Sequence, residues 1–193
     1  MDPFRMIVGR ATSLPQANID TDIIFPARFL VITEKLGLGR FAFHDRPDLA
    51  LAPGTAILIA GDNFGSGSSR EQAPWALADH GIRAIVATSF GEIFQSNCFK
   101  NGLLPIVLSS PEVESLHNAA CRGELLTIDL EIQEIRIPQY SNICFAIDPA
   151  RRVALLQGRD EIARIRECFA PAINAFEVGQ RSTSPWLWSN ESR

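Results

Sequence analysis

The sequence lacks closely spaced metal-ligating residues. No Cys-x-x-Cys pair occurs, and the three histidines show no ligand spacing. Zinc knuckles and self-contained iron–sulfur clusters depend on such local spacing. We therefore expect no metal site in this chain and four reduced, mostly buried thiols: Cys98, Cys121, Cys144 and Cys168.

Long apolar runs and blocks of positive charge are also missing. No run approaches the length of a membrane helix, and the start of the chain has no apolar stretch of the signal-peptide kind. A net charge of −4 without a Lys/Arg-rich block argues against nucleic acid. We expect a cytoplasmic protein with neither a membrane nor a nucleic-acid partner.

The most informative segment is the run 61–71, with the sequence Gly-Asp-Asn-Phe-Gly-Ser-Gly-Ser-Ser-Arg-Glu. It follows an apolar, strand-like run and leads into a helix-like one. Glycines let a ligand approach the backbone, and the N–H groups at a helix start attract anions. Arg70 adds a forked cation that suits a carboxylate or a phosphate. The run predicts a site for a small acid.

Three familiar motifs do not fit this run. It has no lysine after its last glycine, as a P-loop requires, and Arg70 stands where a dinucleotide fingerprint needs a third glycine. No serine stands in the Gly-x-Ser-x-Gly pattern of a hydrolase elbow, and no histidine is near in sequence. A serine acting here without a histidine base would need positive charge to stabilise its alkoxide.

The two serines also have a structural interpretation. Ser68-x-x-Glu71 and Ser69-x-x-Gln72 both fit the spacing of a capping box. The two interpretations are compatible, since a capping serine also faces an anion bound at the helix start. Because of Pro74, we expect an irregular first turn and a regular helix from about that residue.

The order of strand-like and helix-like runs predicts an α/β domain with an added antiparallel part. Residues 82–88 form a continuous apolar run after a helix, typical of a strand buried on both faces, whereas residues 126–132 alternate strictly. The strand-like runs are 5–10, 19–24, 56–60, 82–88, 104–108, 125–137 and 143–147. The helix-like runs are 74–80, 90–99, 111–121, 149–156 and 159–169. We expect one domain over 1–176 and a tail over 177–193 that is loose or packs on a partner.

Two further segments carry unusual residues. In the run 18–22, Asn-Ile-Asp-Thr-Asp, the two carboxylates would point the same way on a strand and share a role, or would form a turn. The run 89–105 predicts a helix from Ser89 that ends at Asn101-Gly102, with most of its residues used in packing.

These segments resemble one family in order and approximate spacing: 18–22, the loop 63–71, Ala73-Pro74-Trp75-Ala76-Leu77 and 89–105. The chain is similar to the small subunit of 3-isopropylmalate dehydratase (isopropylmalate isomerase), which is related to the swivelling domain of aconitase. The similarity covers about residues 5–176. It implies an α/β fold, a three-layer β/β/α swivelling domain of the aconitase type that closes over a separate large subunit.

The resemblance also implies the chemistry. It indicates a hydro-lyase of leucine biosynthesis, active only as a heteromer with its large subunit, that interconverts 2-isopropylmalate and 3-isopropylmalate through 2-isopropylmaleate. The large subunit would carry a [4Fe-4S] cluster, and this chain would hold no cofactor. Ser68 would be the base that removes a carbon-bound proton, Ser69 would assist it, and Arg70 would bind a substrate carboxylate. The implied substrate-binding residues are Asp20, Thr21, Asp22, Arg28, Leu36, Leu38, Gly65 and Gly67.

The identity of the substrate is left open by three features. Gln72 stands where the family usually has histidine, and it cannot carry the charge of an imidazolium. Leu36 and Leu38 offer apolar surface for an alkyl group, yet Arg28, Lys35 and Arg40 would also suit a third carboxylate. The alternatives are a methylmalate, dimethylmalate or homoaconitate-type dehydratase, or a non-catalytic anion-binding regulatory module. Because one methylene changes binding by only about 1–3 kcal/mol, the sequence does not identify the alkylmalate.

Overall fold

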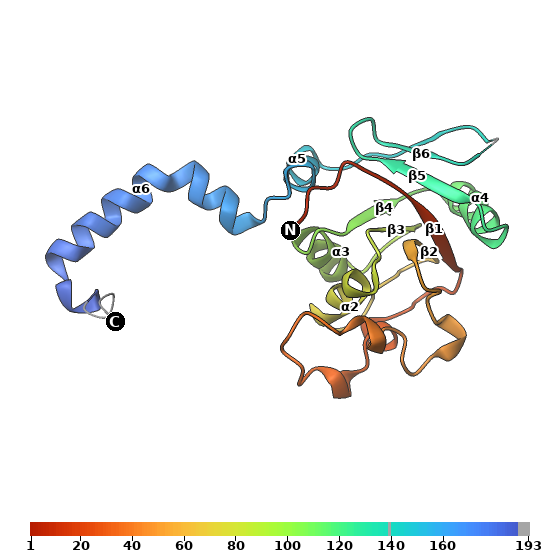
Figure 1. Ribbon diagram of the computed structural model, residues 1–193, viewed down its shortest axis with the longest axis horizontal. Helices are drawn as coiled ribbons and strands as arrows, with labels where there is room; N and C mark the ends of the chain where they lie inside the picture. Colours follow the sequence, from red (N-terminus) through yellow and green to blue (C-terminus); the bar gives the residue numbers. More distant parts are fainter. Residues whose placement is uncertain (139, 189–193) are drawn as a thin grey trace. The chain divides into compact units, whose positions relative to one another are not determined.

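The structure, a computed structural model, describes residues 1–138 and 140–188. Seven strands form one mixed sheet in the order β4-β3-β2-β1-β5-β6-β7 (Figure 1). The strands are β1 (Met6–Leu14), β2 (Thr55–Ala60), β3 (Ala84–Ala87), β4 (Leu104–Val107), β5 (Leu125–Asp129), β6 (Glu134–Arg136) and β7 (Ile143–Cys144). β1 to β4 pair in parallel, whereas β5, β6 and β7 extend the sheet from β1 in antiparallel fashion. The predicted α/β class with an added antiparallel part is confirmed.

Helices cover both faces of the parallel strands (Figure 1). The helices of the described residues are α1 (Thr21–Ile24), α2 (Gln72–His80), α3 (Glu92–Lys100), α4 (Ser110–Cys121), α5 (Pro149–Gln157) and α6 (Glu161–Thr183), of which α6 belongs to a separate unit and does not pack in either core cluster. Short 3-10 turns occupy Ala27–Phe29, Gly39–Phe41, Pro47–Leu49 and Pro185–Leu187.

Two core clusters lie on opposite faces of the parallel strands because successive side chains of a strand point to opposite sides. Leu58 of β2 packs in one cluster with Leu77 of α2 and Phe94 of α3. Its neighbour Ile59 packs in the other with side chains of α4 and of the antiparallel strands, such as Ile128. The parallel strands therefore lie between α2 and α3 on one face and, on the other, α4 together with side chains from β5 to β7 of the same sheet.

The chain divides into two compact units between Gly158 and Arg159. The second unit contains α6, which continues past residue 176. The domain end predicted at residue 176 therefore falls inside a helix, and it stays a prediction. The tail predicted for 177–193 is helical as far as Thr183, and residues 189–193 lie outside the described part. No helix in the described part is long and apolar enough to span a membrane.

Three expectations about local structure are wrong. The strand predicted at 19–24 is instead the short helix α1, because Asp20 accepts a hydrogen bond from the backbone N–H of Ile23 (2.8 Å) and caps it. The strand predicted at 125–137 is interrupted by a turn, in which Gln133 takes a positive φ of 58°. Of the four thiols expected to be mostly buried, only Cys98 is buried.

Candidate active site

The glycine-rich run 61–71 connects β2 to α2, as predicted, and the segment 18–22 holds it from one side. The backbone N–H of Gly65 donates to the carbonyl of Ile19 (2.7 Å), and that of Thr21 donates to the carbonyl of Ser66 (2.9 Å). The buried hydroxyl of Thr21 donates to the carbonyl of Ser68 (2.9 Å). Thr21 therefore fixes the backbone on which the first candidate serine stands.

The turn after β3 holds the run from the other side. The hydroxyl of Ser89 accepts from the backbone N–H of Asn63 (2.8 Å) and donates to the carboxylate of Asp62 (2.6 Å). Thr88 donates to the same carboxylate (3.1 Å), and the backbone N–H of Phe64 donates to the carbonyl of Ser89 (3.1 Å). The hydrogen bond from Ser89, and then that from Thr88, lowers the pKa of Asp62. Both segments singled out in the sequence thus flank the loop.

Glycine is required where the loop turns over α3. Gly65 has φ +74°, and a Cβ atom there would lie 2.2 Å from Cγ of Phe94. Gly67 has φ +92°, where its missing side chain leaves the backbone open next to Asp20 and Thr21. The ring of Phe94 thus sets the path of the backbone that leads to Ser68.

Ser68 and Ser69 are exposed, and the prediction that they cap the helix is wrong. α2 begins at Gln72, so Glu71 is the N-cap residue, and no side chain makes a cap hydrogen bond. A capping side chain usually accepts from the N–H of the third helical residue, which here is Pro74 and has none. In the described part of the chain, neither serine hydroxyl has a hydrogen-bond partner.

Arg70 forms an ion pair with Asp22, which lies in the first turn of α1. The Arg70 side chain is only 13% exposed, whereas that of Asp22 is 53% exposed. The hydrogen bond from Arg70 lowers the pKa of the Asp22 carboxyl despite some desolvation. Asp20 fixes this geometry indirectly by capping α1. The predicted residues of the segment 18–22 therefore meet the predicted residues of the serine loop.

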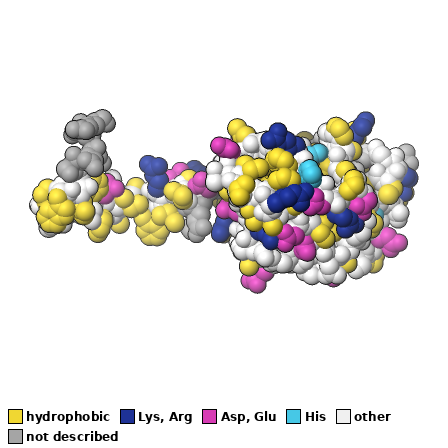
Figure 2. Space-filling view, turned by 90° about the horizontal axis from the view of Figure 1, so that it is seen from below, with side chains coloured by type: hydrophobic (Ala, Val, Ile, Leu, Met, Phe, Trp, Pro, Cys, Tyr) yellow, Lys and Arg dark blue, Asp and Glu magenta, His cyan; other side chains and the backbone are white. Residues whose placement is uncertain are grey.

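Three other residues predicted to bind the substrate, Arg28, Leu36 and Leu38, make no contact of this kind with the serine loop among the described residues. Arg28 pairs with Asp45, stacks on the ring of Phe29 (4.5 Å to its centroid), and lowers the pKa of Asp45 to about 2. Leu38 is fully buried in the core, so we leave it out of the proposed site, whereas Leu36 is 85% exposed. Figure 2, seen from the side on which Figure 1 draws residues 21–50, shows basic, acidic and apolar side chains intermixed on this face.

The cysteines of this chain do not fit an iron–sulfur cluster, which is typically held by Cys thiolates that converge on it. Cys98 is buried in α3, and burial raises the pKa of its thiol well above the usual value. The other three lie in α4, β7 and α6. Within the described residues, no group of three or more His, Cys, Asp or Glu side chains is arranged to hold a metal ion.

Comparison with known proteins identifies the family. The model of the aconitase C-terminal domain family matches residues 48–111, which include the serine loop. The 3-isopropylmalate dehydratase small subunit of Xanthobacter autotrophicus is 45% identical, over 97% of this chain and 100% of its own. That of Rhodospirillum centenum is 46% identical, over 96% and 98%.

Among solved structures, 3-isopropylmalate dehydratase (LeuD) from Methanocaldococcus jannaschii superposes with a TM-score of 0.70 at 28% identity, over 89% of this chain and 99% of that one. The fold predicted from the resemblance is confirmed by this match. The similarity to these two small subunits covers at least 96% of this chain, so it includes the site loop. The chain belongs to the family of 3-isopropylmalate dehydratase small subunits.

Proposed function

We propose that this chain is the small subunit of a hydro-lyase that interconverts 2-isopropylmalate and 3-isopropylmalate through 2-isopropylmaleate in leucine biosynthesis. The observation that carries the proposal is the pair of exposed serine hydroxyls next to the largely enclosed Arg70, in a loop fixed from both sides. Such an arrangement suits proton transfer at a bound dicarboxylate, because reacting groups must be held in place before the substrate arrives.

Ser68 acts as the base in this proposal. Its oxygen, as an alkoxide, takes the proton from the substrate carbon next to the hydroxyl-bearing carbon. The electron pair of that C–H bond forms the double bond as hydroxide leaves the neighbouring carbon, so the substrate loses the elements of water as a proton held by Ser68 and a hydroxide ion, and the reverse addition of both consumes them again. Rehydration in the opposite orientation returns a proton from Ser68 and gives the isomer. The positive charge of Arg70 and the N-terminus of the nine-residue helix α2 favour the alkoxide.

Arg70 binds a substrate carboxylate in this proposal, and Asp22 orients it. A guanidinium has five N–H donors in a plane, so it can keep its pair with Asp22 and still donate to a second carboxylate. Ser69 assists through its hydroxyl and backbone N–H. The open backbone at Gly65 and Gly67 lets the acid approach closely.

A large subunit must complete the site. The name of the relatives, small subunit, supports a heteromeric enzyme, and the family resemblance assigns a [4Fe-4S] cluster to the partner. Since no group of three or more His, Cys, Asp or Glu side chains among the described residues is arranged to hold a metal ion, we assign to this chain the proton-transferring serine and the carboxylate site.

An alkylmalate is favoured over a tricarboxylate because two of the three candidate cations are engaged with other groups. Arg28 pairs with Asp45, and Lys35 hydrogen-bonds to Asn101. The exposed Leu36 offers apolar surface for a neutral alkyl group. Methylmalate and dimethylmalate remain alternatives, since a pocket of this kind discriminates only weakly by methylene number.

The test is to combine the chain with a cluster-loaded large subunit and to follow the absorbance of the unsaturated intermediate with a panel of substituted malates. We expect the highest kcat/KM for isopropylmalate. Higher turnover of a methylmalate or of homoaconitate would assign the enzyme to a paralogous reaction. Complex formation without turnover of any malate would instead support a non-catalytic anion-binding module.

A further inference from the structure

The side-chain amide of Asn101, just after α3, uses all of its hydrogen-bonding capacity. Its oxygen accepts from the indole N–H of Trp75 (2.9 Å) and from Nζ of Lys35 (3.3 Å). Its nitrogen donates to the carboxylate of Glu71 (3.2 Å) and to the carbonyl of Asn97 (2.9 Å). An amide offers two acceptor and two donor positions, so this one is fully satisfied.

The partners of Asn101 belong to three parts of the fold that the proposed reaction needs. Glu71 directly follows Arg70 and is the N-cap residue of α2. Trp75 lies in the first half of that helix. Lys35 comes from the loop 31–38, and its ammonium also lies 4.4 Å from the centroid of the Trp75 ring, a cation–π contact.

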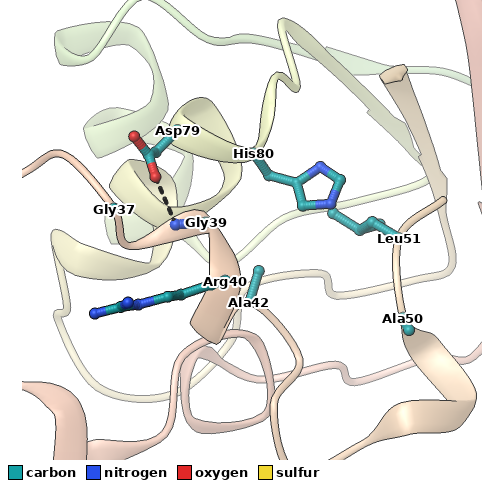
Figure 3. A pocket seen from close by; sticks show the side chains of 8 residues that line it. All are labelled: Gly37, Gly39, Arg40, Ala42, Ala50, Leu51, Asp79 and His80. Atoms are coloured by element: carbon teal, nitrogen blue, oxygen red, sulfur yellow. Dashed lines mark hydrogen bonds between the residues drawn. The ribbon is translucent and has the colours of Figure 1, made fainter. Parts of the chain in front are cut away.

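A second contact anchors the end of this loop on the same helix. The backbone N–H of Gly39 donates to the carboxylate of Asp79 (2.7 Å; Figure 3). A Cβ atom at Gly39 would lie 2.7 Å from the backbone nitrogen of His80, so only glycine permits this approach. Trp75 and Asp79 are four residues apart and share one face of α2. The loop 31–38 is thus held along α2 at two points about one helical turn apart.

Side chains around the second anchor line a recess of about 460 Å³. In Figure 3 the ring of His80 points toward Leu51, whereas Arg40 extends along the opposite side. The carboxylate of Asp79 is occupied by Gly39, and the guanidinium of Arg40 stacks on Phe41 (4.7 Å). The Asp79 carboxylate of the recess is therefore engaged by the end of the loop, whereas Nδ1 of His80 is buried without a hydrogen-bond partner among the described residues.

We propose that Lys35 and Asn101 are positioning residues that hold the loop 31–38 against α2 and so fix its place relative to Ser68 and Arg70. The inference rests on the proposed function, since the loop carries the exposed Leu36 that we assign to the alkyl group of the substrate. Ile32 packs against the core and Leu38 is buried in it, so apolar contacts fix both ends of the loop, whereas Leu36 between them is 85% exposed and is not held by burial. The polar contacts of Lys35 hold the middle of the loop, next to Leu36.

The experiment replaces Lys35 by Met, which keeps the apolar stem and removes the charge and the donors. Lys35→Arg is the conservative rescue, and Lys100→Met is the matched control, since the chain has only these two lysines and both are exposed. Hydrogen–deuterium exchange of the isolated chain measures the loop, and steady-state kinetics of the reconstituted pair with 2-isopropylmalate measures the site.

We expect Lys35→Met to speed backbone exchange in 31–38 by about five-fold, the effect of losing one cation–π contact with its hydrogen bond. We expect KM to rise by a similar factor while kcat and the melting temperature stay near wild type, and Lys35→Arg to restore both readouts. A merely structural role would move the melting temperature and leave KM alone.

Unchanged exchange in 31–38 would overturn the proposal, and so would an unchanged KM in a pair that turns over. If the wild-type pair turned over no malate, the proposed function would fail and the catalytic part of this inference with it. The exchange data would then still decide, independently of turnover, whether Lys35 holds the loop.

Discussion

At the scale of single residues, the account depends on how Arg70 is held. Its guanidinium is mostly enclosed, and Asp22 pairs with it from the rim of the site. An enclosed charge without a partner is costly, so the carboxylate keeps Arg70 ionised and oriented before a substrate arrives. Because the carboxylate is half exposed, it leaves one side of the pair accessible to a second acid.

Arg70→Lys should weaken substrate binding more than it slows the chemical step. A lysine keeps the charge but loses the planar fork that can serve two carboxylates at once. We expect KM of the reconstituted enzyme to rise about ten-fold, with kcat lowered less, in steady-state assays. Arg122→Lys, at a surface pair with Glu124, is the matched control and should leave both constants unchanged. Equal constants for Arg70→Lys and wild type would exclude a direct carboxylate contact.

The Asp22–Arg70 pair should contribute to stability only where Asp22 is ionised. Folding lowers the pKa of Asp22 below its usual 3.8, so its contribution is present above that pH and is lost as the pH falls through the lower, folded-state value. At pH 7 Asp22→Asn should lower the free energy of unfolding by about 1 kcal/mol or less, since the carboxylate is half exposed and screened.

Urea titrations from pH 7 down to pH 2.5 test this prediction. The difference between wild type and Asp22→Asn should shrink as the pH falls below about 4. A difference that stays constant over this range would show that the variant acts by some route other than the ion pair.

At the scale of elements, the serine loop is a turn clamped between two other segments. The run 18–22 and the turn after β3 each supply backbone and side-chain hydrogen bonds to it, and the ring of Phe94 packs against Gly65 from α3. The exposed serines therefore stand on a backbone whose position is set by the core. This is the support that a preorganised site requires.

Gly65→Ala should be strongly destabilising, by about 2–4 kcal/mol, because it adds a clash with Phe94 to the cost of a left-handed backbone. Gly37→Ala is the matched control. Gly37 has a similar φ of +82° with no atom within 4 Å of an added Cβ, so it should cost only about 1–2 kcal/mol. Chemical denaturation measures both values. Equal losses would mean that the ring of Phe94 yields freely and does not fix the loop.

The sequence was sufficient for elements whose pattern is local and long. The apolar run before the glycines and the buried run 82–88 predict strands, and both are present as β2 and β3, which pair in parallel. The segment 19–24 has the same apolar character, but its Asp20 side chain captures a backbone N–H and starts a helix instead. Over six residues, the apolar pattern cannot decide between a strand and a short helix that a side chain caps.

The site was predictable only where its residues form a local sequence motif. The loop and its two flanking segments were found because each has a distinctive short motif. The capping role of the serines was wrong because Pro74 takes the third helical position and has no N–H to donate. Leu38 was predicted to bind the substrate, but it lies in the core. Its burial depends on the docking of the neighbouring Gly39 against α2. The network of Asn101 had no sequence signal, because it joins residues that are 26 to 66 positions apart.

At the scale of the whole molecule, we propose that the chain carries one part of an active site that a large subunit completes. The compact unit Met1–Gly158 contains the serine loop, both flanking segments and the loop 31–38. The relatives that share its length are named small subunits, and the proposed reaction needs groups that this chain does not supply. In this proposal activity is a property of the pair, so we expect a single-chain assay to detect none.

The most direct measurement is the formation of 2-isopropylmaleate, followed by its absorbance, when a cluster-loaded large subunit is mixed with wild-type chain, Ser68→Ala or Ser69→Ala. The account predicts product with the wild-type chain and none from either subunit alone. It predicts a loss of at least about a hundred-fold in kcat for Ser68→Ala, a smaller loss for Ser69→Ala, and unchanged assembly in both. Near-normal kcat for Ser68→Ala in a fully assembled pair would contradict the assignment of Ser68 as the base.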